Sequence, residues 1–138
     1  MILLDTNVLI CASAAESPFR RWSRNVVAEA VSGEGAGTSV VSLAEICVGA
    51  AEPETVAETI RGWGVAILEV PPAAAEPCAR AYRLYRRRRR DEASREAPAM
   101  PLPDFFIGAH AEVMGWRIAT ADEGRFRTYF PSVRLVTP

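Results

Sequence analysis

The sequence contains no lysine, and all 16 of its basic side chains are arginine in a chain of 138 residues with a formal net charge of -1. A P-loop needs a lysine amine at the β- and γ-phosphates, and Schiff-base chemistry needs a lysine amine as the nucleophile. The missing lysine therefore excludes both chemistries. Contacts to phosphate must come from arginine, from backbone N–H groups or from a metal ion.

Long apolar runs are also absent, because no stretch approaches the roughly 20 apolar residues that a membrane-spanning helix needs. Asp5 interrupts the segment that would be the apolar region of a signal peptide. We therefore expect a cytoplasmic protein without a membrane segment. Cysteine is limited to Cys11, Cys47 and Cys78, and this odd number with wide spacing favours reduced core thiols over disulfides or a zinc site.

The hydrophobic content of 49% with 24% charged residues is typical of a globular protein, and the length predicts one domain over residues 1–138. Apolar segments alternate with segments of helical spacing, which predicts an α/β protein with a mostly parallel five-stranded sheet covered on both faces. The predicted strands are residues 2–5, 38–41, 65–70, 117–120 and 133–136. The predicted helices begin at Val8 after the capping types Thr6 and Asn7, at Phe19, at Ser42 after the second strand, at Pro53, at Ala73 and at Asp104.

Aspartate is scarce as well, with four residues against 13 glutamates. Asp5 ends the first predicted strand, Glu45 follows the second, and Asp122 follows the fourth. The carboxyl ends of parallel strands meet at one edge of a sheet, so these acids are expected together there. Asp104 begins a helix after the proline-rich segment 91–103, which is a predicted loop, and can join them.

Each acid also has a structural interpretation. Glu45 fits a capping box that begins at Ser42, in which its side chain bonds the Ser42 backbone N–H. Asp104 and Asp122 fit the acids that the helix dipole favours in a first helical turn. Asp5 is harder to explain in this way, because a buried ionised carboxylate must be paired or bound to metal and no lysine exists to pair it.

Taken together, the four acids favour a divalent cation. Carboxylates gathered on one edge repel one another unless a metal ion neutralises them. Oxygen ligands with positions left for water are typical of Mg²⁺ or Mn²⁺. Such a site activates water for phosphodiester chemistry.

Four segments resemble, in order and spacing, the PIN-domain ribonucleases, and most closely the VapC-type toxins of bacterial toxin–antitoxin pairs. The likeness extends from the first strand to Phe130 and Pro131. The four segments are Leu-Asp-Thr-Asn at residues 4–7, Ser-Leu-Ala-Glu at 42–45, Pro-Asp-Phe-Phe-Ile-Gly-Ala-His-Ala at 103–111 and Thr-Ala-Asp-Glu-Gly-Arg-Phe at 120–126.

This resemblance implies a PIN-like three-layer α/β/α sandwich and a metal-dependent endoribonuclease that hydrolyses tRNA, rRNA or mRNA. It implies that Thr6 and Asn7 orient the first carboxylate or a metal-bound water, and that Thr120 holds Asp122 or the nucleophile. Ala121 departs from the arginine or asparagine common at its position and removes one phosphate contact. The implied ligands of one or two Mg²⁺ or Mn²⁺ ions are Asp5, Glu45, Asp104 and Asp122.

The resemblance also implies partners. VapC-type toxins form homodimers and are neutralised by a VapB-type antitoxin, whose C-terminal segment lies along the active-site groove and often offers a basic side chain to the acids. A non-catalytic PIN-fold module that docks RNA or protein is the alternative function. A phosphatase of the aspartyl-phosphate kind is disfavoured, because no second aspartate stands two residues after Asp5.

The arginine run at residues 86–90 has two interpretations. Arginines suit the C-terminal end of a helix, where they complement the dipole and remain solvated. They also suit an RNA-backbone track, for which Arg86, Arg87 and Arg90 are the candidates. The sequence leaves both open.

The only histidine is not expected to act as a general base. His110 stands six residues after Asp104, or about 240° around an ideal helix, so the two do not share a face. We expect a packed or surface histidine. Trp22, Trp63 and Trp116 are expected in the core or at a dimer contact.

Overall fold

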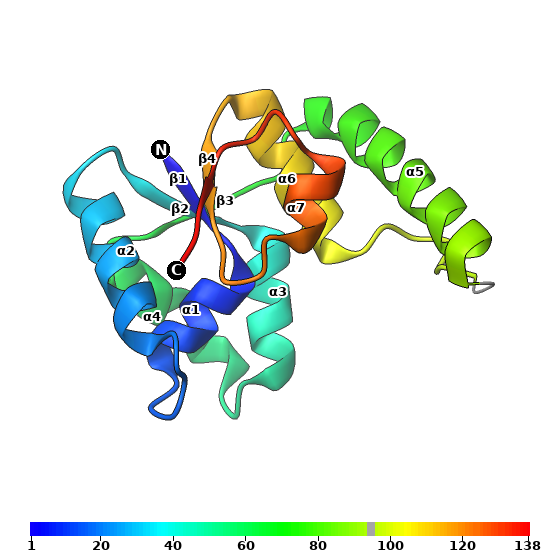
Figure 1. Ribbon diagram of the computed structural model, residues 1–138. Coiled ribbons are helices and arrows are strands. Elements are labelled where there is room, and N and C mark those ends of the chain that lie inside the picture. The colour runs from blue at the N-terminus through cyan, green and yellow to red at the C-terminus, as the bar shows by residue number, and fades with distance from the viewer. Residues whose placement is uncertain (94–95) are drawn as a thin grey trace.

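The computed structural model describes residues 1–93 and 96–138, in which helices alternate with five parallel strands (Figure 1). The strand order is β3-β2-β1-β4-β5, with β1 at the centre. This arrangement confirms the predicted α/β class and shows that every strand pair is parallel. The strands are β1 (Ile2–Leu4), β2 (Ala36–Ser39), β3 (Ala66–Leu68), β4 (Arg117–Ala119) and β5 (Leu135–Val136).

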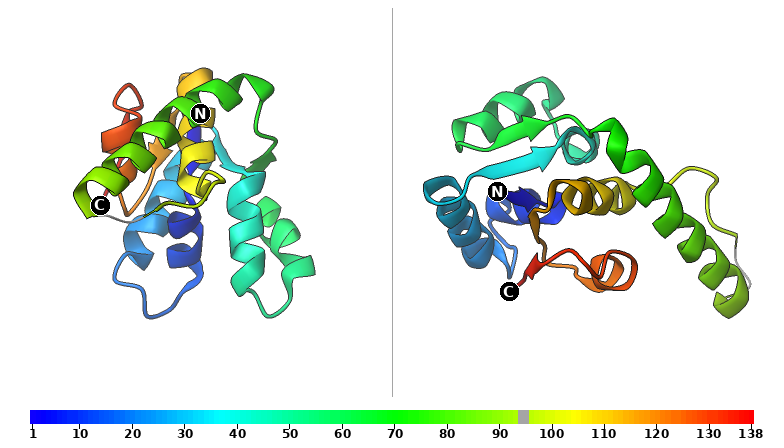
Figure 2. Two further views of the ribbon diagram at one scale, coloured as in Figure 1. Left: turned by 90° about the vertical axis from the view of Figure 1, so that its right-hand side faces the viewer. Right: turned by 90° about the horizontal axis from the view of Figure 1, so that it is seen from above.

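Helices cover both faces of the sheet and produce the three expected layers (Figure 2). One core lies between the sheet and α1, α2 and α4, and the other lies between the sheet and α5, α6 and α7. The helices are α1 (Thr6–Ser13), α2 (Arg20–Ser32), α3 (Val40–Gly49), α4 (Pro53–Gly62), the 3-10 helix η1 (Pro72–Ala74), α5 (Ala75–Ala93), α6 (Pro103–Met114) and α7 (Gly124–Tyr129).

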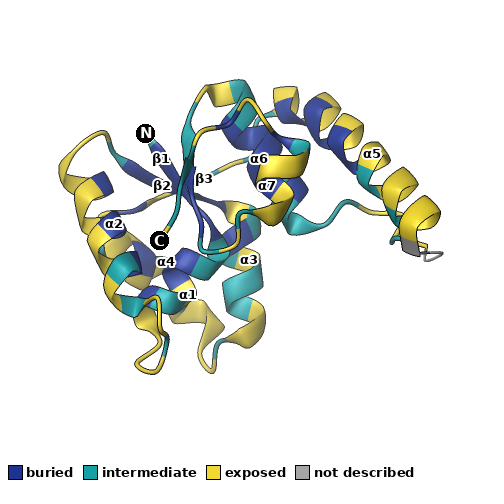
Figure 3. Ribbon diagram, viewed as in Figure 1, coloured by how far each residue is buried: buried dark blue, intermediate teal, exposed yellow. Residues whose placement is uncertain are grey.

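The central strand β1 is buried on both faces, as a covered parallel sheet requires (Figure 3). Successive side chains of a strand point to opposite faces. Leu3 accordingly packs in the core beneath α5 and α6, while Ile2 and Leu4 pack in the core beneath α1 and α2. The whole of β1 therefore reads as a continuous apolar run in the sequence.

Backbone hydrogen bonds just after the last residues of β1 and β4 align the carboxyl ends of β1, β4 and β5. The backbone N–H of Asp5 donates to the carbonyl of Ala119 (3.0 Å), and that of Thr120 donates to the carbonyl of Val136 (3.0 Å). Asp5 and Thr120 thus leave neighbouring strands side by side. This is the edge at which the sequence predicted a site.

The starts of two helices differ from the prediction. α1 begins at Thr6, because Asp5 itself is the N-cap and accepts a hydrogen bond from the Thr6 N–H (2.8 Å). β2 ends at Ser39, whose hydroxyl accepts from the Val41 N–H (3.1 Å) and starts α3 two residues earlier than expected. The predicted capping box from Ser42 to Glu45 is therefore wrong.

Other boundaries also shift. The predicted loop from Asp91 is wrong at its start, because α5 continues to Ala93, and residues 94–95 of that loop lie outside the described part of the chain. The short helix α7 was not predicted. The strand expected over residues 133–136 is limited to Leu135–Val136.

α6 packs closely on the C-terminal segment through a glycine. A Cβ atom at Gly108 would lie 2.3 Å from two ring carbons of Phe130, so only glycine lets the helix approach this ring. Gly115 then ends α6 in the left-handed conformation (φ 65°). Both glycines position α6, whose first turn carries Asp104.

The apolar residues singled out in the sequence are placed largely as expected. Trp22 and Trp63 pack against the core beneath α1 and α2, and Trp116 packs against the core beneath α6. Within the described residues the three cysteines are free thiols, but only Cys78 is buried, so the prediction of core thiols is wrong for Cys11 and Cys47. No helix of the described chain combines the length and the apolar character needed to cross a membrane.

Candidate active site

Asp5 is the centre of the polar edge. Its side chain is only 3% exposed, yet no arginine of the described chain lies within ion-pair distance of it. Three donors hold the carboxylate instead. The Thr6 N–H donates to Oδ1 (2.8 Å), while the Asn7 amide (2.6 Å) and the Thr120 hydroxyl (2.8 Å) donate to Oδ2.

Asn7 and Thr120 also bond each other and the chain after β4. The Asn7 amide nitrogen donates to Thr120 Oγ1 (3.1 Å), and its carbonyl oxygen accepts from the Ala121 N–H (2.9 Å). Thr120 Oγ1 accepts from the Asp122 N–H (3.0 Å), which closes a short turn. The start of α1 and the end of β4 are thereby locked around Asp5.

Glu45 reaches the same edge from α3. The Thr6 hydroxyl donates to Glu45 Oε2 (2.5 Å), although the two residues are 39 positions apart in the chain. This bond connects α3 to the first residue of α1, next to Asp5. Glu45 therefore contributes to the edge and does not serve as a cap for its own helix.

Asp104 pairs with an arginine, whereas Asp122 bonds the backbone of its own turn. Arg125 Nη1 donates to Asp104 Oδ2, in a pair whose side chains are 47% and 25% exposed. Asp122 is exposed, and its Oδ1 accepts from the Gly124 N–H (3.3 Å) at the start of α7. The hydrogen bond and the charge of Asp104, together with the charges of Tyr85 and Asp122, raise the pKa of Arg125 against the opposing effect of burial.

Arg125 is the residue that the sequence prediction missed. It follows Asp122 by three residues, within the segment that carries the PIN resemblance, and stands in the first turn of α7. The signal that could have indicated Arg125 is its spacing, because it is a basic residue three positions after an acid at a strand end. Its partner Asp104 lies 21 positions away and could not be inferred from spacing.

The electrostatics of the edge centre on the buried carboxylate. Burial raises the pKa of Asp5 from 3.8 to about 7, against the lowering effect of the Thr120 and Thr6 hydrogen bonds. The negative charges of Asp104 and Glu45 raise that pKa further. Asp104 and Glu45 are thus close enough to Asp5 to affect its ionisation.

The donor chemistry fits Mg²⁺ or Mn²⁺, because the acids offer oxygen ligands and carry a mutual repulsion that a divalent ion relieves. Their side chains are not gathered for an ion, however. In the described part of the chain no three acidic, histidine or cysteine side chains lie close enough together to coordinate one. Asp104 bonds Arg125 and Asp122 bonds its own turn, so an ion bound to these carboxylates would compete with those contacts.

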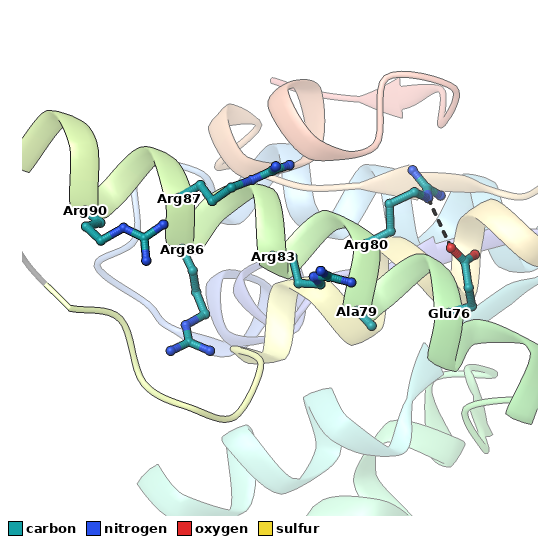
Figure 4. A pocket seen from close by; sticks show the side chains of 7 residues that line it. All are labelled: Glu76, Ala79, Arg80, Arg83, Arg86, Arg87 and Arg90. Carbon is teal, nitrogen blue, oxygen red and sulfur yellow. Dashed lines mark ion pairs between the residues drawn. The ribbon is translucent and has the colours of Figure 1, made fainter.

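The arginine candidates stand outside this cluster. Arg86, Arg87 and Arg90 are exposed on α5 and line a groove along that helix (Figure 4). His110 is buried, 2% exposed, with its ring 5.5 Å from the Trp116 ring, and burial lowers its pKa. Of the two expected placements, packed or on the surface, the structure shows the packed one.

A five-stranded parallel sheet between two helical layers, with acidic residues placed along the carboxyl edge, is the architecture of a PIN-type α/β protein. The PIN domain family model matches residues 2–130. The chain belongs to the PIN-domain family. No curated protein sequence matches it.

Solved structures of toxin–antitoxin complexes are similar over the full length. FitAcB from Neisseria gonorrhoeae aligns at 26% identity and a TM-score of 0.63, covering 98% of this chain and 96% of the other. A toxin–antitoxin complex from Klebsiella pneumoniae aligns at 26% identity and a TM-score of 0.64, covering 100% and 98%. VapBC2 from Rickettsia felis, bound to a promoter DNA fragment, shares the fold at 16% identity and a TM-score of 0.65, covering 99% and 98%.

Proposed function

We propose that the chain is a metal-dependent endoribonuclease and the toxin component of a VapBC-type toxin–antitoxin pair. The observation that carries this proposal is Asp5, a buried carboxylate without a cationic partner, held by Asn7 and Thr120 and coupled to Asp104 and Glu45. A carboxylate in such a position is costly to ionise unless a cation binds it. The similarity to toxin–antitoxin complexes supports the biological role.

The four acids Asp5, Glu45, Asp104 and Asp122 would hold Mg²⁺ or Mn²⁺. The ion would supply a water activated as the nucleophile and a positive charge on the leaving oxygen. The residues around Asp5 prepare this site. Asn7 and Thr120 direct one carboxylate oxygen while the Thr6 N–H holds the other, so the carboxylate cannot rotate freely.

Arg125 has a second role in the proposal. It pairs with Asp104 in the metal-free chain and is 47% exposed, so it can turn to an RNA phosphate once Asp104 binds the ion. A guanidinium recognises phosphate through paired N–H donors. This arginine supplies a phosphate contact close to the position where Ala121 lacks one.

RNA cleavage by the purified protein tests the activity. We expect cleavage that requires Mg²⁺ or Mn²⁺ and is lost in Asp5→Asn and Asp104→Asn. Glu29→Gln is the control, because Glu29 is an exposed acid on α2 and belongs neither to the acidic edge nor to α5. Undiminished cleavage, or undiminished growth arrest, by both site variants would refute the proposal.

Calorimetry with Mn²⁺ separates this function from the alternative. A nuclease binds the ion, and Asp5→Asn weakens that binding. If the wild-type protein binds RNA but no Mn²⁺, the chain is a non-catalytic PIN-fold binding module.

The proposed antitoxin partner matches an apolar groove between α1, α3 and α4. The groove holds about 580 Å³ and reaches Glu45 at one end. Ile10, which is 47% exposed, contributes to its wall. We propose that the antitoxin packs an apolar segment here and that the toxin is a homodimer in the complex. Co-expression of the product of a neighbouring open reading frame should restore growth, and Ile10→Asp should abolish this rescue.

A further inference from the structure

Positive charge in this chain is concentrated on one helix. α5 carries seven arginines and three acids, whereas the rest of the chain carries nine arginines and 14 acids. The helix is therefore four charges positive in a chain with a net charge of -1. Its C-terminal half projects from the body of the protein (Figure 1).

The arginines of α5 fall into two groups. The guanidinium of half-buried Arg89 lies 6.0 Å from the Tyr85 ring centroid and donates to the Tyr85 hydroxyl (2.7 Å), and that of Arg88, which is exposed, lies 6.0 Å from the Tyr129 ring centroid. Arg80 is occupied by Glu112 (2.5 Å). These three are accounted for by contacts within the chain.

The remaining arginines form one exposed face. Arg83, Arg86, Arg87 and Arg90 follow the i, i+3, i+4, i+7 spacing that places side chains on the same side of a helix. In the described part of the chain, the first three have no carboxylate within 4.0 Å, and Arg90 has only Asp91 at 3.9 Å. They line a groove of about 600 Å³ beside the helix (Figure 4).

This face adjoins the segment that leads to the acids. The chain after α5 returns to α6, whose first turn carries Asp104. The Tyr82 hydroxyl donates to the Pro98 carbonyl (2.7 Å) and holds that returning segment against α5. This segment therefore connects the helix that carries the arginine face to the helix that carries Asp104.

We propose that Arg83, Arg86, Arg87 and Arg90 bind the RNA backbone next to the cleavage site. The inference rests on the proposed endoribonuclease function and specifies how its substrate is held. The face spans about 10 Å from Arg83 to Arg90 at 1.5 Å per residue, and a stacked strand presents a phosphate about every 3.4 Å along its axis. The face therefore matches about three successive phosphates.

The test measures the salt dependence of RNA binding. A mixed-sequence single-stranded RNA is titrated in EDTA, so that no cleavage occurs, and fluorescence anisotropy is recorded at several salt concentrations. In the variant Arg83→Gln/Arg86→Gln/Arg87→Gln, the slope of log K against log salt should fall by about 2, because each phosphate contact on a single strand contributes about 0.7. Affinity at low salt should fall by about tenfold or more.

Two control variants separate the effect of the arginine face from the effects of total charge and of helix folding. Arg21→Gln/Arg61→Gln/Arg134→Gln removes the same charge from exposed arginines away from α5, and should keep most of the slope. Arg83→Lys/Arg86→Lys/Arg87→Lys keeps the charge and should keep the slope, with circular dichroism reporting an intact helix. Equal losses in the two glutamine variants, or no loss in the α5 variant, would overturn the proposal.

Two further outcomes separate the alternatives. If the α5 variant keeps RNA binding but loses binding to poly-glutamate, the face binds an acidic protein and the proposal fails. Suppose that the salt dependence of RNA binding falls in the α5 variant but the wild-type protein does not cleave RNA with Mg²⁺ or Mn²⁺. The arginine face then binds RNA as proposed, and the nuclease function is refuted. If the wild-type protein cleaves RNA but the slope is unaltered in the α5 variant, the nuclease function is supported and the proposed role of the arginine face fails.

Discussion

Arg125 donates a hydrogen bond to Asp104, so a cation of the chain itself occupies one of the carboxylates that the sequence predicts as metal ligands. The pair joins the first turn of α7 to the first turn of α6. A divalent ion that binds Asp104 must displace this guanidinium or share the carboxylate with it. If Asp104 is a metal ligand, as we propose, the affinity for metal should depend on an arginine that is not itself a ligand.

Arg125→Gln should strengthen Mn²⁺ binding, because Asp104 is then released from its partner. A partly exposed ion pair contributes about 0.2–1 kcal/mol, which corresponds to a gain of up to about fivefold in affinity. Isothermal titration calorimetry measures this gain. Arg127→Gln is the control, because Arg127 pairs with Glu123 (2.5 Å) four residues before it and should leave the affinity unchanged. An Arg125→Gln protein that binds Mn²⁺ as weakly as wild type, or more weakly, would contradict the competition.

The stability of the metal-free protein should fall as the pH rises from about 4 to above 7. The pKa of Asp5 is raised to about 7 in the folded chain, against an ordinary value of 3.8, so the folded state binds more protons than the unfolded state within this window. The stabilisation is complete below the ordinary pKa and is lost as pH passes the folded one. One pKa unit corresponds to about 1.4 kcal/mol, which makes the total loss a few kcal/mol.

Urea unfolding in EDTA at several pH values measures this effect. The other carboxylates of the chain contribute to the same curve, so the informative quantity is the difference between wild type and Asp5→Asn. This difference should change steadily between pH 4 and 7 and then level off. Parallel curves for the two proteins would show that Asp5 ionises in the folded chain at its ordinary pKa.

Thr120→Val should raise the pKa of Asp5 further, because the lost hydroxyl donates to the carboxylate and lowers that pKa in the native chain. It should also reduce the free energy of unfolding by about 1–3 kcal/mol, since the Asp122 N–H and the Asn7 amide lose an acceptor. Thr120→Ser retains the hydroxyl and is the control. Equal pH midpoints for the valine and serine variants in unfolding experiments would argue against this role.

Gly108→Ala should destabilise the fold by about 1–3 kcal/mol, because the added methyl group meets the Phe130 ring and forces α6 or the C-terminal segment to move. Thermal unfolding measures the loss. Gly62→Ala in α4 is the matched control, because a Cβ atom there meets nothing within 4 Å and alanine favours the helix. If both variants unfold at the wild-type temperature, the packing of α6 on Phe130 is less tight than the contact indicates.

The class of fold and the position of the acids could be predicted from local patterns. Apolar runs such as β1 are continuous because both faces of the central strand are buried, and this burial marks the strand in the sequence. Asp5 at the end of one strand and Asp122 after another must then meet at one edge, because parallel strands end on the same side. The buried Asp5, which lacked any lysine partner, was a correct signal of an unusual carboxylate.

Helix starts were less predictable, because several polar residues compete for each cap. Asp5 and Ser39 cap α1 and α3, although Thr6, Asn7 and Ser42 are suitable types at nearby positions. Which side chain accepts the free N–H depends on where the strand stops. Strand pairing decides this, and pairing is a property of the sheet and not of the local segment.

Contacts between residues far apart in the chain, and the different surroundings of neighbouring arginines, could be seen only in the tertiary structure. Arg125 meets Asp104 because α6 and α7 pack together, and Gly108 meets Phe130 for the same reason. In the arginine run, Arg88 and Arg89 lie against tyrosines whereas Arg86 and Arg87 face the groove. Five identical side chains in sequence cannot be told apart by composition, since the helix sends them in different directions and only the neighbouring elements decide which of them remain exposed.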